Sequence, residues 1–129
     1  MSRADEIAVV TGGTRWKDPI FVRENLDAFH ARRPIREMIC GMAEGVDMMA
    51  YHWCNLRGIP VREFPADWHE HEHRAGPIRN QEMIDENPDI TVGLVFPGHR
   101  GTIDMTRRLR KAGIERVFFE PKTSIADWG

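Results

Sequence analysis

The sequence predicts an α/β protein in which a parallel sheet of about five strands lies between two layers of helices. Short apolar segments alternate with longer segments whose apolar residues recur at helical spacing. This alternation is typical of a parallel sheet with helices on both faces. The length of 129 residues suits one hydrophobic core. We therefore expect a single domain over residues 1–129, with its core at about residues 7–119 and a short irregular tail from Pro121.

Five short apolar segments are predicted as strands. They lie at residues 7–10, 37–40, 61–64, 89–96 and 117–119. We expect 61–64 near an edge of the sheet, because charged residues interrupt it. The segment 89–96 is the most apolar run in the chain, which predicts a position at the centre of the sheet.

Four helices are predicted between these strands. The first begins at Asp18, whose carboxylate can accept hydrogen bonds from the first turn, and Pro19 follows at the first helical position. The second ends at Gly58, the third begins at Pro77, and the fourth ends at Gly113. The apolar faces of the four helices contain Val22, Leu26, Phe29, Val46, Met49, Ala50, Trp53, Ile78, Met83, Ile84, Met105, Leu109 and Ala112.

The composition argues against several classes of protein. The net charge of −2 gives no general positive field for a nucleic-acid backbone, although a local basic patch is compatible with it. No segment approaches the ~20 apolar residues of a membrane span, and the amino terminus lacks the apolar run of a signal peptide. Cys40 and Cys54 lie in apolar contexts, which favours buried, reduced thiols in a cytoplasmic protein.

Residues 69–73, HEHEH, match the zinc-hydrolase pattern H-E-x-x-H. That chemistry needs both histidines on one face of a regular helix, and the flanking prolines leave room for only about two turns. Arg79 also stands where the longer pattern needs a third histidine. We expect a solvated polar loop and no metal. Two alternatives remain open: adventitious metal binding by His69 and His73, or a lid whose charged histidines contact a phosphate.

Three glycine-containing turns carry the candidate ligand site. TGGTR (11–15), CGMAEGVD (40–47) and PGHRGT (97–102) each follow a predicted strand and lead into a helix. They therefore lie at the carboxyl edge of the sheet, where such folds bind ligands. Glycines let backbone N–H groups approach a ligand, helix N-termini favour anions, and arginines add charged hydrogen bonds. The pattern favours a ligand that carries phosphate, although neither G-x-G-x-x-G nor the P-loop pattern is present.

Within these turns, Thr11 and Thr102 can donate hydroxyl hydrogen bonds, and Asp47 can either cap its helix or accept hydrogen bonds from ribose hydroxyls. We expect no cofactor. The turn residues predicted to bind the ligand are Gly12, Gly13, Thr14, Arg15, Gly41, Gly45, Asp47, Pro97, Gly98, His99, Arg100, Gly101 and Thr102.

The motifs TGGTR, GMAEGVD, FPADW, AGPIRNQEM and PGHRGTIDM occur in this order. The set resembles the YpsA-related branch of the SLOG superfamily, Rossmann-like proteins that include short domains of bacteria and phages. The resemblance implies binding of a nucleotide or nucleotide-derived signal, as a sensor or sequestering protein, for example in conflict between phage and bacterium. It adds Arg79 and Asn80 to the predicted site, and it implies a homodimer or higher homo-oligomer.

Two alternatives follow from the same resemblance. The related LOG, or lysine decarboxylase-like, phosphoribohydrolases cleave an N-glycosidic bond, and Arg79 matches their helix arginine. However, His99 and Met105 stand where their PGGxGTxxE motif has a glycine and the catalytic glutamate. Catalysis would need Arg79 together with Asp104 or Glu82, so we favour binding without turnover. The related DprA proteins bind single-stranded nucleic acid, which the acidic balance disfavours.

Overall fold

The computed structural model describes residues 5–121 and contains one five-stranded parallel sheet. The tail predicted after Pro121 lies outside the described residues. In chain order, the elements are β1 (Glu6–Thr11), α1 (Pro19–Arg32), β2 (Ile35–Cys40), α2 (Val46–Arg57), β3 (Val61–Glu63), α3 (Trp68–His71), a 3-10 helix η1 (Glu72–Arg74), α4 (Ala75–Asp85), β4 (Val92–Val95), α5 (Arg100–Lys111) and β5 (Glu115–Phe118).

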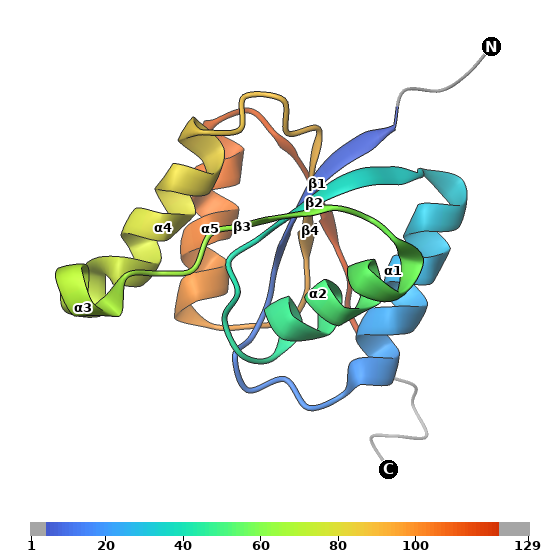
Figure 1. Ribbon diagram of the computed structural model, residues 1–129, viewed down its shortest axis with the longest axis horizontal. Helices are drawn as coiled ribbons and strands as arrows, with labels where there is room; N and C mark the ends of the chain where they lie inside the picture. The colour runs from blue at the N-terminus through green and yellow to red at the C-terminus, as the bar shows by residue number, and fades with distance from the viewer. Residues whose placement is uncertain (1–4, 122–129) are drawn as a thin grey trace.

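The strand order is β3-β2-β1-β4-β5, and each neighbouring pair is parallel. Helices α1 and α2 cover one face of the sheet, and α4 and α5 cover the other (Figure 1). This arrangement confirms the predicted α/β fold and the edge position of the 61–64 segment. The central position predicted for 89–96 was wrong: β1 is central, and β4 lies between β1 and β5. Strand β4 begins only at Val92, because a turn precedes it in which the Ile90 N–H donates to the Asn87 carbonyl.

Two predicted helix ends, the start of α1 at Asp18 and the end of α2 at Gly58, agree with the structure. The Asp18 carboxylate accepts hydrogen bonds from the backbone N–H groups of Ile20 and Phe21, at 3.1 Å in each case. Gly58 ends α2 in a left-handed conformation with φ of 69°, which glycine adopts without the steric cost of a side chain.

The HEHEH stretch is helical, which corrects the predicted polar loop. Asp67 caps α3 by accepting from the Glu70 N–H at 3.0 Å, and Glu72 then adopts a φ of 52° at the start of η1. Helix α4 follows without a break and begins at Ala75 rather than at Pro77. Helix α3 lies at the outer end of α4, to one side of the sheet (Figure 1).

The core has two parts, one on each face of the sheet. On the α1–α2 side, Ala8 and Val10 of β1 belong to a cluster with Leu26 and Trp53. On the α4–α5 side, Val9 belongs to a smaller cluster that contains Ile39, Met83, Met105 and Leu109. Alternate β1 residues therefore face opposite helical layers, as the two-residue period of a strand requires.

Arginine ion pairs join segments near the amino ends of the strands. Arg33 pairs with Glu6 of β1 at 3.0 Å and with Glu115 of β5 at 2.8 Å. On β3, Arg62 pairs with Glu37 of β2 at 2.7 Å and with Asp89 of the turn before β4 at 3.0 Å. These side chains are partly exposed, so each pair contributes only about 0–1 kcal/mol alone. Together the pairs involve residues of β1, β2, β3 and β5 and of the turn before β4.

The two cysteines are buried and carry free thiols, as predicted. Burial raises the pKa of Cys54 to about 12 and that of Cys40 still further, so both thiols are protonated at neutral pH. Among residues 5–121, no helix is long and apolar enough to cross a membrane.

Gly93 provides a test of the packing between β4 and α5. A Cβ atom at this position would lie 2.5 Å from a methyl carbon of Leu109, which is fully buried. We expect Gly93→Ala to lower the free energy of unfolding by about 1–3 kcal/mol through overpacking, measured by urea denaturation. Gly76→Ala is the control, because its Cβ would meet only Trp68 at 3.6 Å. This control should be neutral or stabilising by up to about 1 kcal/mol, and an equal loss in both variants would contradict the packing argument.

Candidate functional site

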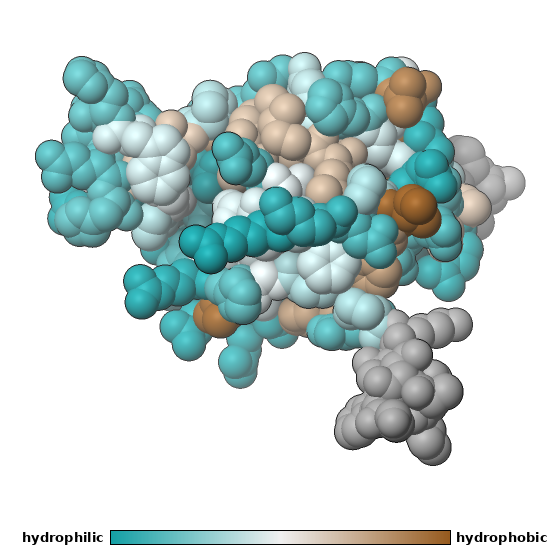
Figure 2. Space-filling view, turned by 90° about the horizontal axis from the view of Figure 1, so that it is seen from below, coloured by the Kyte–Doolittle hydropathy of each residue, from teal (hydrophilic) through white to brown (hydrophobic). Residues whose placement is uncertain are grey.

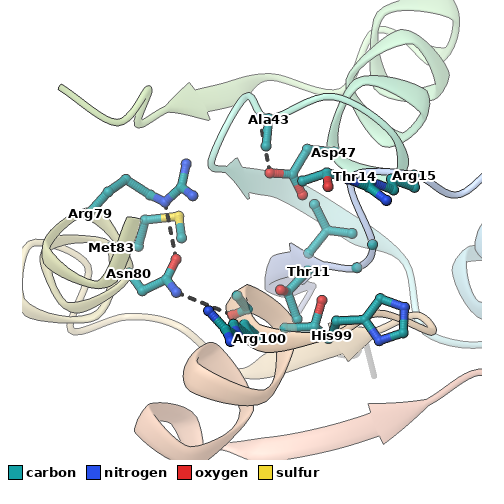
Figure 3. Close-up of a pocket in the computed structure, with 15 residues that line it drawn as sticks. Thr11, Thr14, Arg15, Ala43, Asp47, Arg79, Asn80, Met83, His99 and Arg100 are labelled. Carbon is teal, nitrogen blue, oxygen red and sulfur yellow. Dashed lines mark hydrogen bonds between the residues drawn. The ribbon is translucent and has the colours of Figure 1, made fainter. Parts of the chain in front are cut away.

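A cavity of about 390 Å³ opens at the carboxyl edge of the sheet. The β1–α1, β2–α2 and β4–α5 loops and helix α4 surround it. Figure 2 views the molecule from the side of these loops and shows hydrophilic residues around the edge and residues of intermediate hydropathy in the middle. The residues that line the cavity are Val10, Thr11, Gly12, Gly13, Thr14, Arg15, Ala43, Asp47, Arg79, Asn80, Met83, His99, Arg100, Gly101 and Thr102 (Figure 3).

The three loops touch one another through backbone at Gly13. The Gly13 N–H donates to the Pro97 carbonyl at 2.7 Å, and the Gly13 carbonyl accepts from the Val46 N–H at 3.1 Å. Neighbouring glycines leave no room for side chains: a Cβ at Gly45 would lie 2.2 Å from the Gly13 carbonyl oxygen, and one at Gly98 would lie 2.7 Å from the Gly13 nitrogen. Gly45 also has φ of 78°, a conformation that side chains disfavour.

Most of the residues predicted to bind the ligand line this cavity, but four of them do not: Gly41, Gly45, Pro97 and Gly98. Gly45, Pro97 and Gly98 instead form the contact between the loops, and Gly41 lies against Arg79. Glycine was expected to let a ligand approach the backbone, whereas the group that approaches these glycines in the structure belongs to the same chain.

Sequence reasoning did not place Val10, Ala43 or Met83 in the cavity. Met83 follows Arg79 by four residues on α4 and so shares its helix face, a spacing that could have identified it. Val10 is a strand residue whose apolar side chain carries no ligand signal. Ala43 contributes through its position in a loop, which no pattern indicates.

The first turn of α5 forms one end of the cavity. Arg100, Gly101 and Thr102 begin this helix and line the cavity together with His99. The first N–H groups of a helix have no partner within it, and no side chain caps this end of α5. These N–H groups and the helix dipole make this end of the cavity favourable for an anion.

Arg79 is half-buried and is held in place by backbone and side-chain acceptors. Its Nη1 donates to the carbonyl oxygens of Gly41 and Phe64, and its Nε donates to Asn80 Oδ1 at 3.0 Å. The Asn80 amide donates in turn to Asp104 at 2.9 Å and to the Gly101 carbonyl at 3.3 Å. Asn80 thus orients Arg79 and joins α4 to α5, while Nη2 of Arg79 has no hydrogen bond to any described residue (Figure 3).

Asp47 supplies a buried carboxylate to the opposite side of the cavity. The side chain lies in the first turn of α2, where Gly45 rather than Asp47 is the N-cap residue. One oxygen accepts a hydrogen bond from the Ala43 N–H at 3.2 Å. Burial raises the pKa of Asp47 to about 6, although the Ala43 N–H and the nearby charge of Arg79 act to lower it. The carboxyl group therefore changes its charge close to neutral pH.

Asp104, the carboxylate expected to replace a catalytic glutamate, does not line the cavity. It forms an ion pair with Arg108 at 2.8 Å and accepts from Asn80. Burial acts to raise the pKa of Asp104, but the hydrogen bonds from Arg108 and Asn80 outweigh it and lower the pKa below its ordinary value. Met105, at the position of the glutamate itself, is fully buried in the core.

The histidines of the HEHEH stretch lie away from this cavity. His69 belongs to α3 and His73 to η1, so the two do not share one regular helix as a zinc hydrolase requires. Among residues 5–121, no three histidine, cysteine, aspartate or glutamate side chains are placed to hold a metal ion.

Comparison with known proteins gives two findings. The YspA, cpYpsA-related SLOG family matches residues 7–71 of this chain. The "Gene 61 protein" of Mycobacterium phage D29 is 31% identical over 120 residues, a match that covers 88% of this chain and 96% of the phage protein.

Asp47→Asn tests the buried carboxylate. Because the pKa rises on folding from 3.8 to about 6, the folded state binds the proton more tightly, and stability is lost as the pH rises between these values. At a pH above the folded-state pKa, the buried and ionised carboxylate lowers the free energy of unfolding by on the order of 3 kcal/mol. We expect Asp47→Asn to raise the free energy of unfolding at pH 8 but not at pH 4, measured by urea denaturation.

Asp104→Asn is the matched control for this substitution. The pKa of Asp104 is lowered in the folded protein, so its ionised form stabilises the fold at neutral pH and the effect disappears in acid. The control variant should be less stable than the parent at pH 8. A stabilising effect of equal size in both variants would refute the assigned charge state of Asp47.

Proposed function

This chain belongs to the YspA, cpYpsA-related SLOG family, and we propose that it binds a nucleotide or a nucleotide-derived small molecule at the carboxyl edge of its sheet. Family membership points broadly to nucleotide-related binding or processing. The observation that carries the proposal is the polarity of the cavity, which has the N-terminus of α5 with Arg100 at one end and the buried carboxylate of Asp47 at the other. Its volume of about 390 Å³ falls within the usual range for small-molecule sites.

The phosphate of the ligand is assigned to the first turn of α5. Backbone N–H groups there, the hydroxyls of Thr11 and Thr102, and the charge of Arg100 lie at the cavity wall, and Arg15 lines the cavity beside Thr14 (Figure 3). Oriented N–H groups and guanidinium groups are the usual partners of phosphate oxygens. Arg15 and Arg100 are exposed, so they can approach a ligand without breaking any ion pair of the described chain.

The sugar is assigned to Asp47. An ionised carboxylate repels phosphate but accepts hydrogen bonds from hydroxyl groups, and the oxygen that does not bind Ala43 is available for them. A ligand with an anion at one end and adjacent hydroxyls at the other fits both requirements. A ribonucleoside monophosphate has this chemistry. Arg79 lies beside Asp47 on the α4 side, where its Nη2 can donate to the base or sugar.

Binding without turnover fits the presence of the buried Met105 where the related LOG phosphoribohydrolases have their catalytic glutamate. A protein of this kind would sense or sequester its ligand. The phage relative supports a setting in phage biology, such as competition between phage and bacterium for a nucleotide signal.

Hydrolysis of an N-glycosidic bond is the second candidate function, with Asp47 in place of Asp104 or Glu82 as the acting carboxylate. Asp47 is the carboxylate that lines the cavity, and a pKa of about 6 suits a group that donates and accepts a proton near neutral pH. Asp104 is engaged by Arg108 and Asn80, and Glu82 lies outside the cavity.

Arginine variants test the binding proposal. We expect a ribonucleotide to be released from the purified protein and identified by mass spectrometry, or to bind from a nucleotide panel in calorimetry. Arg79→Ala and Arg100→Ala should each weaken binding by about 10- to 150-fold, since a charged hydrogen bond contributes about 1.5–3 kcal/mol. Arg23→Ala removes an exposed charge of α1 outside the cavity and should have no effect. The proposal fails if no nucleotide binds, or if Arg23→Ala weakens binding as much as Arg79→Ala.

Turnover is tested separately by chromatography of free base after incubation with nucleoside monophosphates. If the chain is a hydrolase, base release should be abolished by Asp47→Asn and retained in Asp104→Asn, because only Asp47 lines the cavity. Tight binding of a nucleotide without release of base would exclude hydrolysis of that nucleotide and leave the binding proposal intact.

A further inference from the structure

A groove of about 220 Å³ lies between α1 and α2, the two helices that cover one face of the sheet (Figure 1). Ile20 and Arg23 of α1 line it, as do Met49, Trp53 and Leu56 of α2. Within each helix these residues recur at intervals of three or four, which places them on one helix face. None of them lines the carboxyl-edge cavity, so this α1–α2 groove is a separate surface.

The α1–α2 groove is largely apolar, and its borders are open to solvent. Leu56 is 83% exposed and Ile20 is 53% exposed, whereas Trp53 is buried. Trp53 therefore forms the floor, and the two aliphatic side chains form the borders. A single exposed leucine is ordinary at a protein surface, but several apolar side chains around one depression are typical of an interaction site. A partner that covers them removes apolar surface from water.

The floor of the groove is held in place by contacts within the protein. Trp53 Nε1 donates to Asp27 Oδ1 of α1 at 2.8 Å. Arg57 pairs with the same carboxylate oxygen at 2.5 Å, and its guanidinium carbon lies 4.7 Å from the centre of the Trp53 ring. Because these contacts orient the ring before any partner arrives, binding does not have to order it. Tryptophan and arginine are also among the residues that most often dominate the energy of an interface.

The charge along the groove is positive. Three basic side chains line it, Arg23, His52 and Arg57, and no carboxylate does. Asp27 balances Arg57, whereas Arg23 forms no ion pair with any residue from 5 to 121. A negative group at the border of the groove can therefore pair with Arg23 without displacing an existing partner. The surface is complementary to a partner that is apolar along its centre and acidic at its edge.

We propose that the α1–α2 groove binds an amphipathic helix of a partner protein, with a row of apolar side chains in the groove and an acidic side chain beside Arg23. A row of side chains at helical spacing packs between two helices as a ridge in a groove. An extended strand fits less well, because α1 and α2 offer no open sheet edge. A second copy of this chain is disfavoured, because a two-fold contact places the same patch on itself and brings like charges together. The proposal does not rest on the nucleotide site.

Fluorescence anisotropy with a labelled synthetic peptide tests the proposal on the full chain. The peptide forms a helix of about four turns, with leucines at intervals of three and four residues and glutamates beside them. In its counterpart, lysines replace the glutamates. We expect the glutamate peptide to bind and the lysine peptide to bind about fivefold more weakly or less. Leu56→Ser should weaken the glutamate peptide at least about tenfold, since it removes the burial of a leucine. Arg23→Glu should reverse the preference between the two peptides.

Ile103→Ser is the matched control, because Ile103 is 49% exposed on α5 and lies outside the groove. It should leave the binding of both peptides unchanged. Thermal melting verifies that each variant is folded, and light scattering measures the mass of the parent and of Leu56→Ser.

The proposal is overturned if the glutamate peptide does not bind, or if the lysine peptide binds as tightly. It is also overturned if Ile103→Ser weakens binding as much as Leu56→Ser, or if Arg23→Glu leaves the preference unchanged. Dissociation of a parent oligomer by Leu56→Ser would show that a second copy occupies the groove. Binding of anionic lipid vesicles that Leu56→Ser abolishes would show that a membrane does.

Discussion

Gly13 holds the carboxyl edge of the sheet together, and the geometry of the cavity depends on it. Its N–H group donates to Pro97 of the β4–α5 loop, and its carbonyl group accepts from Val46, the first residue of α2. The absence of side chains at Gly45 and Gly98 allows this contact. The first turns of α2 and α5 are thereby fixed relative to each other and to the end of β1. Asp47 and the N-terminus of α5 then face the same cavity from opposite sides.

A second connection brings α4 to this framework. Arg79 reaches from α4 to the Gly41 carbonyl at the end of β2, and Asn80 binds Asp104 and the Gly101 carbonyl on α5. Both donors of the Asn80 amide are used within the protein, so this residue positions Arg79 rather than presenting a free group to the cavity. Helix α4 is thus attached both to the residue that follows β2 and to α5. Arg79 therefore enters the cavity in a defined orientation.

The fold could largely be predicted from the sequence, because alternating apolar periods and the Asp18 and Gly58 helix signals are local. The cavity of the candidate site lies at the carboxyl edge of the sheet, where the sequence predicted a site. Strand order is not local, which is why 89–96 was wrongly placed at the centre of the sheet. The roles of Gly45 and Gly98 depend on which loop lies beside them. The raised pKa of Asp47 depends on its burial by surrounding residues, which the sequence next to Asp47 does not indicate. The helical form of HEHEH depends on its capping and its continuity with α4.

The ion pairs of Arg33 and Arg62 have a consequence for how this protein can change over evolutionary time. They join the strands near their amino ends, whereas the exposed Arg15 and Arg100 stand at the opposite edge and form no ion pair with the described residues. Replacing Arg15 or Arg100 therefore removes no cross-link between strands. A lineage can therefore exchange these two residues while the scaffold keeps its ion pairs.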